Sequence, residues 1–343
     1  MKTRILTSLS LIVVILSMAN LFAGQAQKAN RSEPQKIASQ SAQAGPELQM
    51  PPPKLDAGAH LNPMKIALLH WYLADTSAVF PVGNQPYGLC FDGTNIWTAN
   101  FAGNNVTKVR ASDGQLLGTF DGGTQPYGVT FDGANVWVSN QLDNTVTKLR
   151  ASDGKNLGTF RTGMFPAWMA FDGQSLWVPN SRDNTVSKLR TTDGKILGTF
   201  AVGNAPVAIA FDGANVWVTD DASVTKLRAS DGKVLGTFTV GNGALGIAFD
   251  GANIWVANRN DSTVTELRAS DGTVLGTFST PDGAYGVAFD GTYIWVSGDL
   301  YTYVLKASDG AQVGSARLSA VGVAFDGTYV WMAETSFNRI HKF

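Results

Sequence analysis

Few side chains in this sequence are suited to catalysis. Its 343 residues include only three histidines, His60, His70 and His341, and one cysteine, Cys90. A Ser–His–Asp arrangement needs a histidine beside the nucleophile, and a cysteine-based metal site needs several thiolates. Neither can be assembled from this repertoire, and no Gly-rich loop follows a strand and opens a helix to hold phosphate. A single cysteine also permits no intramolecular disulfide.

A second group of side chains is suited to binding. Aromatic and charged residues interrupt a repeated pattern, and together they can form an aromatic floor with a charged rim. Trp168 stands where most repeats have glycine, and a tyrosine precedes that position in three repeats. The alternative is ordinary sequence drift on solvent-facing loops. The candidate ligand-binding residues are Tyr87, Tyr127, Phe165, Trp168, Arg182, Asp220, Arg259 and Tyr285.

Acidic residues near these positions raise the question of a bound cation. Ca²⁺ takes six to eight oxygen ligands. On the loops near these positions each repeat has one or two acidic residues without dense spacing, as at Asp220-Asp221 and Asp299. Solvated turns are the favoured interpretation, and no catalytic residue, metal ligand or cofactor is predicted. A divalent cation, Mg²⁺ or Ca²⁺, held near the axis of the fold remains the alternative.

The interrupted pattern is a repeat of seven units. Phe-Asp-Gly triplets recur at spacings of 40, 40, 40, 38, 40 and 36 residues, and a tryptophan follows each one. A period near 40 with Asp-Gly turns is typical of a β-propeller with one repeat per blade. The triplets begin at Phe91, Phe131, Phe171, Phe211, Phe249, Phe289 and Phe325, and the tryptophans are Trp97, Trp137, Trp177, Trp217, Trp255, Trp295 and Trp331.

One repeat predicts four strands, at residues 127–131, 135–140, 145–150 and 156–160. Asp-Gly between alternating apolar runs is a strong hairpin signal, because glycine adopts the positive φ of a tight turn. Identical placement of tryptophan in every blade favours packing between blades over a ligand-binding ring. Lys148 and Arg150 on the third strand, with Asp nearby, predict a solvated outer face.

The two ends of the repeat array predict how the ring closes. Residues 338–343 match a third strand, whereas residues 79–83 (VFPVG) align with the fourth strand at 237–241 (TFTVG). The N-terminal strand should therefore complete the last blade, which removes the exposed edges of an open array. The predicted fold is all-β: a seven-bladed propeller of four-stranded blades.

The residues before the repeats predict targeting. Lys2 and Arg4 precede an apolar run and a small-residue exit, which is typical of a signal peptide over residues 1–26. An uncleaved membrane anchor is the alternative. Residues 27–64 are rich in Gln, Ala, Ser and Pro and predict a disordered linker. The propeller domain is assigned to residues 65–343, including a short cap segment at 65–76.

Charge indicates which partners to expect. A formal net charge of −1 gives no electrostatic reason to expect nucleic acid or an anionic membrane surface. The expected partner is a small molecule, a glycan or a protein at the loop-rich face around the propeller's channel. The protein is expected to be a monomer and, once the signal is cleaved, not to be embedded in a membrane.

Two stretches carry a family resemblance. PYGVTFDGANVWVSN, at residues 126–140, and DGKVLGTF, at 231–238, resemble YVTN/NHL-type propellers, and more narrowly the bacterial streptogramin (virginiamycin B) lyase-like proteins. The resemblance covers residues 77–343. It implies a metal-assisted elimination with a histidine general base that opens a cyclic ester. Glu334 lies in a matching blade motif, but the catalytic histidine pattern is missing, so no catalytic residue carries over.

Three functions are consistent with these observations. The first is a secreted or periplasmic, non-catalytic binding or scaffold propeller, favoured because the repeats are nearly identical. The second is an extracytoplasmic enzyme, a metal-assisted lyase or lactone hydrolase of the family type. The third is a cell-surface adhesion protein tethered by the linker. Fold alone does not separate them.

Overall fold

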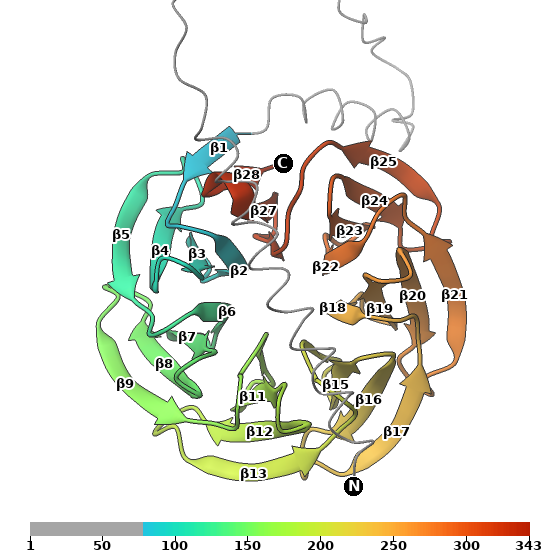
Figure 1. Cartoon of the computed structure of the whole chain (residues 1–343), viewed down its shortest axis with the longest axis horizontal. Helices are drawn as coiled ribbons and strands as arrows, with labels where there is room; N and C mark the ends of the chain where they lie inside the picture. Colours follow the sequence, from blue (N-terminus) through green and yellow to red (C-terminus); the bar gives the residue numbers. More distant parts are fainter. Residues whose placement is uncertain (1–77) are drawn as a thin grey trace, which may run out of the picture. The chain divides into compact units, whose positions relative to one another are not determined.

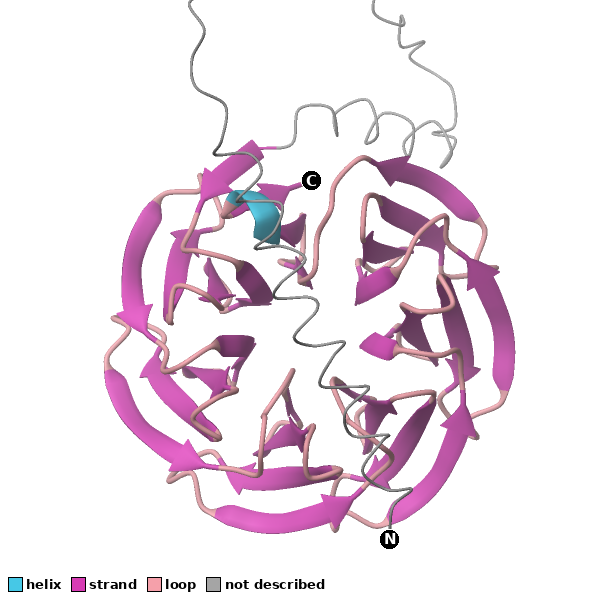
Figure 2. Cartoon of the chain, in the orientation of Figure 1, coloured by secondary structure: helices cyan, strands magenta, loops and turns pink. Residues whose placement is uncertain are grey.

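The computed structural model describes residues 78–343, which form a ring of seven sheets (Figures 1 and 2). Each sheet has four antiparallel strands, the first near the axis and the fourth at the circumference. The prediction of an all-β, seven-bladed propeller is confirmed. The second and third strands, such as β7 and β8, are buried on both faces because each blade is packed between two neighbours, whereas the outer strands alternate between exposed and half-buried residues.

The strands follow the repeats in order. Blades 1 and 2 comprise β2 (Pro86–Phe91), β3 (Asn95–Asn100), β4 (Asn105–Arg110), β5 (Leu116–Asp121), β6 (Pro126–Phe131), β7 (Asn135–Asn140), β8 (Thr145–Arg150) and β9 (Asn156–Arg161). Blades 3 and 4 comprise β10 (Ala170–Phe171), β11 (Ser175–Asn180), β12 (Thr185–Arg190), β13 (Ile196–Ala201), β14 (Ile209–Phe211), β15 (Asn215–Asp220), β16 (Ser223–Arg228) and β17 (Val234–Thr239). Blades 5 and 6 comprise β18 (Ala244–Phe249), β19 (Asn253–Asn258), β20 (Thr263–Arg268), β21 (Val274–Ser279), β22 (Ala284–Phe289), β23 (Tyr293–Gly298), β24 (Thr302–Lys306) and β25 (Gln312–Ala316).

Blade 7 joins the two ends of the described chain. It contains β26 (Val323–Phe325), β27 (Val330–Glu334) and β28 (Arg339–Lys342), with the short 3-10 helix η1 (Thr335–Phe337) between the last two. Strand β1 (Ala78–Pro81) pairs antiparallel with β28, from Ala78 opposite Lys342 to Pro81 opposite Arg339. The predicted closure by the N-terminal strand is confirmed, and Pro81 is tolerated because β1 has one unpaired edge.

Glycine in the first strand, or directly before it, allows neighbouring blades to approach each other closely. A Cβ placed on Gly322 would lie 1.9 Å from the Tyr87 carbonyl oxygen, and one on Gly88 would lie 2.6 Å from the Tyr127 carbonyl oxygen. Both obstacles are backbone atoms that cannot rotate away. A side chain at these positions would therefore push two blades apart.

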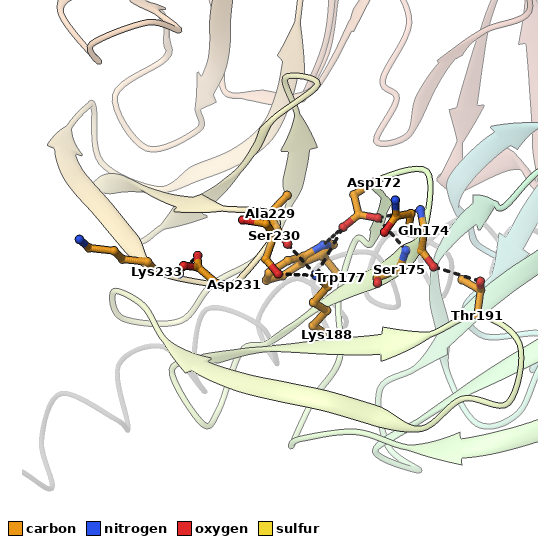
Figure 3. Close-up of polar contacts among 10 residues, drawn as sticks. All are labelled: Asp172, Gln174, Ser175, Trp177, Lys188, Thr191, Ala229, Ser230, Asp231 and Lys233. Atoms are coloured by element: carbon orange, nitrogen blue, oxygen red, sulfur yellow. Dashed lines mark hydrogen bonds and ion pairs between the residues drawn. The ribbon is translucent and has the colours of Figure 1, made fainter.

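Each blade tryptophan packs against the next blade and is also anchored by a carboxylate. Trp177 is fully buried and packs with Ile209 and Val216 of blade 4. Its indole Nε1 donates to Asp172 Oδ2 at 2.7 Å (Figure 3). The prediction that these tryptophans fill blade interfaces is confirmed. The Asp of each Phe-Asp-Gly triplet does more than form a turn, because the same indole bond of 2.7–2.8 Å recurs in all seven blades.

The third-strand lysines contradict the prediction of a solvated outer face. Lys188 Nζ lies 5.1 Å above the Trp177 ring and donates to the Ala229 carbonyl of the next blade at 2.6 Å (Figure 3). Lys148 is only 8 % exposed and donates in the same way to the Thr191 carbonyl. The prediction was wrong for lysine because the apolar stem covers the indole while the ammonium finds a carbonyl. It was correct for Arg150, whose exposed guanidinium pairs with a nearby aspartate.

The predicted signal peptide at 1–26, the linker at 27–64 and the cap segment at 65–76 lie outside the described residues. Within residues 78–343, no helix is long and apolar enough to cross a membrane.

Candidate functional site

The candidate residues lie at one end of the blades. In blade 1, Pro86 pairs with Asn100, Asn100 with Asn105, and Asn105 with Asp121. The start of each first strand therefore lies beside the end of the second strand, and the loops at those points share one face of the ring. We call it the loop face.

Aromatic rings from three neighbouring blades form a continuous row on the loop face. The Tyr87 ring lies 5.1 Å from Phe101 and 5.1 Å from Tyr127. Tyr127 in turn lies 5.1 Å from Trp168. Tyr87 is buried, while the other three rings are half-buried, so the row keeps accessible surface. Trp168 joins the row because it replaces the inner-strand glycine, and its backbone N–H donates to Val207 of the next blade at 2.9 Å.

A guanidinium and a third tyrosine lie together on blades 5 and 6. The Arg259 Cζ atom lies 4.7 Å from the centre of the Tyr285 ring. The Tyr285 hydroxyl donates to Asp299 Oδ1 at 2.8 Å, and Arg259 Nη2 lies 3.4 Å from the same oxygen. The Arg259 Nε atom is buried without a hydrogen-bond partner among residues 78–343. Arg259 therefore has donor capacity that the described residues leave unused.

The two groups influence one another across the axis. Burial raises the pKa of Tyr87 to about 12, and the Arg259 charge opposes that rise. Burial also raises the pKa of Tyr127, with contributions from Tyr87 and Tyr285, while Arg259 again lowers it. Both effects of Arg259 are electrostatic, and its direct ring contact is with Tyr285. We call Phe101, Tyr87, Tyr127, Trp168, Tyr285 and Arg259 the axial cluster.

The other predicted residues lie elsewhere. Arg182 is exposed, with its Cζ atom 4.3 Å from the centre of the buried Phe165 ring, and the two form a separate pair on the loop face. Asp220 is fully buried at the end of β15, where the Thr225 hydroxyl donates to its Oδ2 at 2.7 Å. Its burial raises its pKa to about 6, against hydrogen bonds from Thr225, Ser223 and the Gly203 amide. The structure therefore places Asp220 within a blade.

The residue directly after each second strand also lies on the loop face. Among the residues at this position, only the charged ones were considered in the sequence analysis. Two of the seven side chains donate to a backbone carbonyl of the next blade: Ser181 Oγ to Pro206 at 2.6 Å, and Thr335 Oγ1 to Pro86 at 2.8 Å. These contacts show that the position points toward the next blade's first strand. That geometry brings Phe101 to Tyr127 and Arg259 to Tyr285. The full series is Phe101, Gln141, Ser181, Asp221, Arg259, Asp299 and Thr335.

A histidine–carboxylate pair in blade 7 was also missed. His341 Nε2 lies 2.6 Å from Glu334 Oε2, and the Arg339 Nε–H donates to the same oxygen. Burial raises the pKa of Glu334, but the bonds to His341 and Arg339 outweigh it and the net pKa is lowered. Glu334 and His341 occupy the positions where blade 1 has Asn100 and Thr107, which are hydrogen-bonded at 2.8 Å. The pair could have been found from the register of the predicted hairpin.

Metal-ligating side chains do not gather on this part of the chain. Among residues 78–343 no group of three or more His, Cys, Asp or Glu side chains is placed to hold a metal ion. His60 and His70 lie outside that range.

Comparison with known proteins assigns the fold to a class. The chain is a seven-bladed β-propeller, and it resembles the virginiamycin B lyase-like proteins in architecture. A solved structure described as streptogramin B lyase superposes with a TM-score of 0.68 at 16 % identity, covering 78 % of this chain and 98 % of that one. A structure of Kuenenia stuttgartiensis hydrazine synthase superposes with a TM-score of 0.66 at 18 % identity, covering 76 % and 95 %. No family model and no curated protein matches the sequence. At these identities the likeness concerns the fold alone.

Proposed function

We propose that this protein is a non-catalytic binding propeller that holds its ligand against the axial cluster. The observation that carries the proposal is the cluster itself. Tyr127 and Trp168 lie 5.1 Å apart on the loop face, Arg259 stacks on Tyr285 at the same face, and Tyr127, Trp168 and Arg259 are all half-buried. Concave sites lined by aromatic rings with a few polar groups are the usual form of ligand sites.

The chemistry of the cluster favours binding over catalysis. Burial keeps the pKa of Tyr87, Tyr127 and Tyr285 above the ordinary value for tyrosine. These hydroxyls therefore stay protonated near neutral pH and act as hydrogen-bonding groups. A general base works best with a pKa near the operating pH, and none of the three phenols meets that condition.

Replacing Trp168 by Gly is expected to weaken ligand binding about tenfold while the protein stays folded. The half-buried indole contributes a stacking surface beside Tyr127, and its removal restores the residue type of most other blades. The measurement is a thermal-shift screen of the purified protein against aromatic acids, oligosaccharides and peptides, followed by calorimetry on each hit with both variants.

Trp217→Phe is the matched control. Trp217 is fully buried between blades 4 and 5, so this change should lower stability and leave affinity unchanged. A ligand that binds the wild type and Trp168→Gly with equal affinity binds elsewhere. A screen that finds no ligand counts against the binding function.

A second candidate function is a metal-assisted lyase or lactone hydrolase. Two observations favour it: the shared architecture with the structure described as streptogramin B lyase, and the buried Glu334–His341 pair. If the protein is a non-catalytic binding propeller, calorimetric titration with Mg²⁺ and with Ca²⁺ should show no stoichiometric binding of either ion. Saturable binding of one ion per chain that is lost in Glu334→Gln would instead support the enzyme.

Location outside the cytoplasm is part of the proposal. It is supported by the basic, apolar and small-residue order at the N-terminus. Fractionation of expressing cells tests it: a mature chain shortened near residue 26 in the periplasm or medium supports secretion. Full-length protein in the membrane fraction points to an uncleaved anchor, and protein fixed at the cell surface to the adhesion alternative.

A further inference from the structure

Arg259 gives the axial cluster a chemical preference that its aromatic rings alone do not provide. Its guanidinium lies over the Tyr285 ring on the loop face, the same face that carries the aromatic row. Its charge lowers the pKa of Tyr87 and Tyr127 against the larger effect of burial. Stacking holds the planar group in place, so its N–H fork is ordered before any ligand arrives. Guanidinium groups held in this way recognise carboxylates through paired, charge-assisted hydrogen bonds.

The aromatic row supplies the other half of the site. Phe101, Tyr87, Tyr127 and Trp168 follow each other at 5.1 Å intervals, and the hydroxyls of both tyrosines stay protonated. A flat ring can stack along this surface while its acidic group reaches toward Arg259. Resting on the proposed binding function, we propose that the site takes a small aromatic carboxylate, with its ring on the aromatic row and its anion on Arg259.

Asp299 is the group that opposes this ligand. It lies 3.4 Å from Arg259 Nη2 and accepts the Tyr285 hydroxyl bond on the same oxygen. The long contact leaves the Arg259 charge incompletely compensated, and the buried Nε has no partner among the described residues. A ligand carboxylate therefore competes with Asp299 for one edge of the guanidinium. Removing the Asp299 charge should strengthen binding, whereas removing the Arg259 charge should weaken it.

The test uses three probes, benzoate, 4-hydroxyphenylacetate and indole-3-acetate, each beside its uncharged amide. Calorimetry on the purified full chain is expected to show acids binding more tightly than amides. Arg259→Gln should lower affinity for the acids about 10- to 100-fold without changing affinity for the amides, as expected for lost charge-assisted bonds. Asp299→Asn should raise affinity for the acids about threefold or more, because it removes a competing anion.

Two further arginines serve as comparisons. Arg150→Gln removes an exposed guanidinium from the opposite end of a blade and should change nothing. If Arg182→Gln lowers affinity for the acids and Arg259→Gln does not, the carboxylate binds at Arg182 and the proposed placement of the anion is wrong. Arg259→Lys shows whether charge alone or the planar fork is needed, and circular dichroism confirms that each variant is folded.

The other possible results separate the carboxylate preference, the aromatic preference and the binding function from one another. If acids and amides bind equally and Trp168→Gly weakens both, the carboxylate preference is wrong while the binding function stands. If glucuronate binds and the aromatic acids do not, the aromatic half of the inference is wrong. If no acid binds at millimolar concentration, the inference fails, and the broader screen with Trp168→Gly decides the binding function by itself.

Discussion

At pH 7, Asp220→Asn is expected to raise the free energy of unfolding by up to about 3 kcal/mol. Burial raises the pKa of the Asp220 carboxyl from its ordinary value of 3.8 to about 6. That rise corresponds to about 3 kcal/mol of cost for the ionised form in the folded protein. An asparagine occupies the same place in other blades, where Asn140 Nδ2 donates to Thr147 Oγ1 at 2.8 Å. Urea unfolding at pH 7 measures the gain, which corresponds to roughly 6–12 °C in melting temperature.

The pH dependence follows from the direction of the shift. Because the folded-state pKa is higher than the unfolded one, the folded state binds the extra proton between about pH 4 and pH 6. Wild-type stability from this group therefore falls as pH rises through that window. The difference in free energy of unfolding between wild type and Asp220→Asn should be small near pH 4 and should reach its maximum above about pH 7. Comparing the two proteins at each pH cancels the titration of all other carboxylates.

Asn140→Asp is the matched control for this effect. It places a carboxylate at the same position in blade 2, and it should destabilise the protein above about pH 6 with little effect near pH 4. If Asp220→Asn lowers stability at pH 7, or if its effect does not change with pH, then Asp220 ionises with an ordinary pKa and the burial argument is wrong.

The blade architecture was predictable because its determinants are local. Strands, Asp-Gly turns and the period all depend on residues within one repeat of about 40. Even the missed bond from Trp137 to Asp132 spans only five residues, and its spacing is the same in every repeat. It was missed because the Asp of Asp-Gly has a sufficient explanation as a turn former. That explanation leaves its second carboxylate oxygen unassigned.

The role of Lys148 was not predictable in this way. Its carbonyl partner Thr191 lies 43 residues further along the chain, in the next blade. A lysine in an alternating strand is ordinarily solvated, and only the packing of two blades brings its ammonium to a carbonyl. Blades 5 and 6 have Glu266 and Val304 at the equivalent positions. The interblade bond is thus a frequent feature of the repeat.

The axial cluster was predictable only in part. The repeat places Tyr87, Tyr127 and Tyr285 at one position, so their common location on the loop face follows from the sequence. The influence of Arg259 on the tyrosines of blades 1 and 2 depends on how closely seven sheets approach the axis, which no single repeat encodes. Asp220 looked like a rim residue because it ends a strand, yet it occupies the buried position that asparagine holds in blade 2.

Closure of the ring rests on a few contacts of blade 7. The Phe80 ring lies 5.6 Å from Trp331, and Trp331 packs with Leu89 and Ile96 of blade 1. Lys342 Nζ donates to the Ala111 carbonyl of blade 1 at 2.7 Å. These are the same kinds of contact that join interior blades. Strand β1 adds the pairing with β28 and the Phe80 ring against Trp331, so it completes a blade that already contacts blade 1.

Deleting residues 78–82 is expected to cost on the order of 5 kcal/mol, through the lost Phe80 packing and the ladder to β28. The melting temperature, measured by tryptophan fluorescence, should drop by roughly 10 °C or more. The free edge of β28 should also promote association, which light scattering detects. Phe80→Ala, which keeps the backbone ladder, should cost about 3 kcal/mol without association. An unchanged melting temperature after the deletion would show that blade 7 is stable with three strands, and that the N-terminal strand does not hold the ring closed.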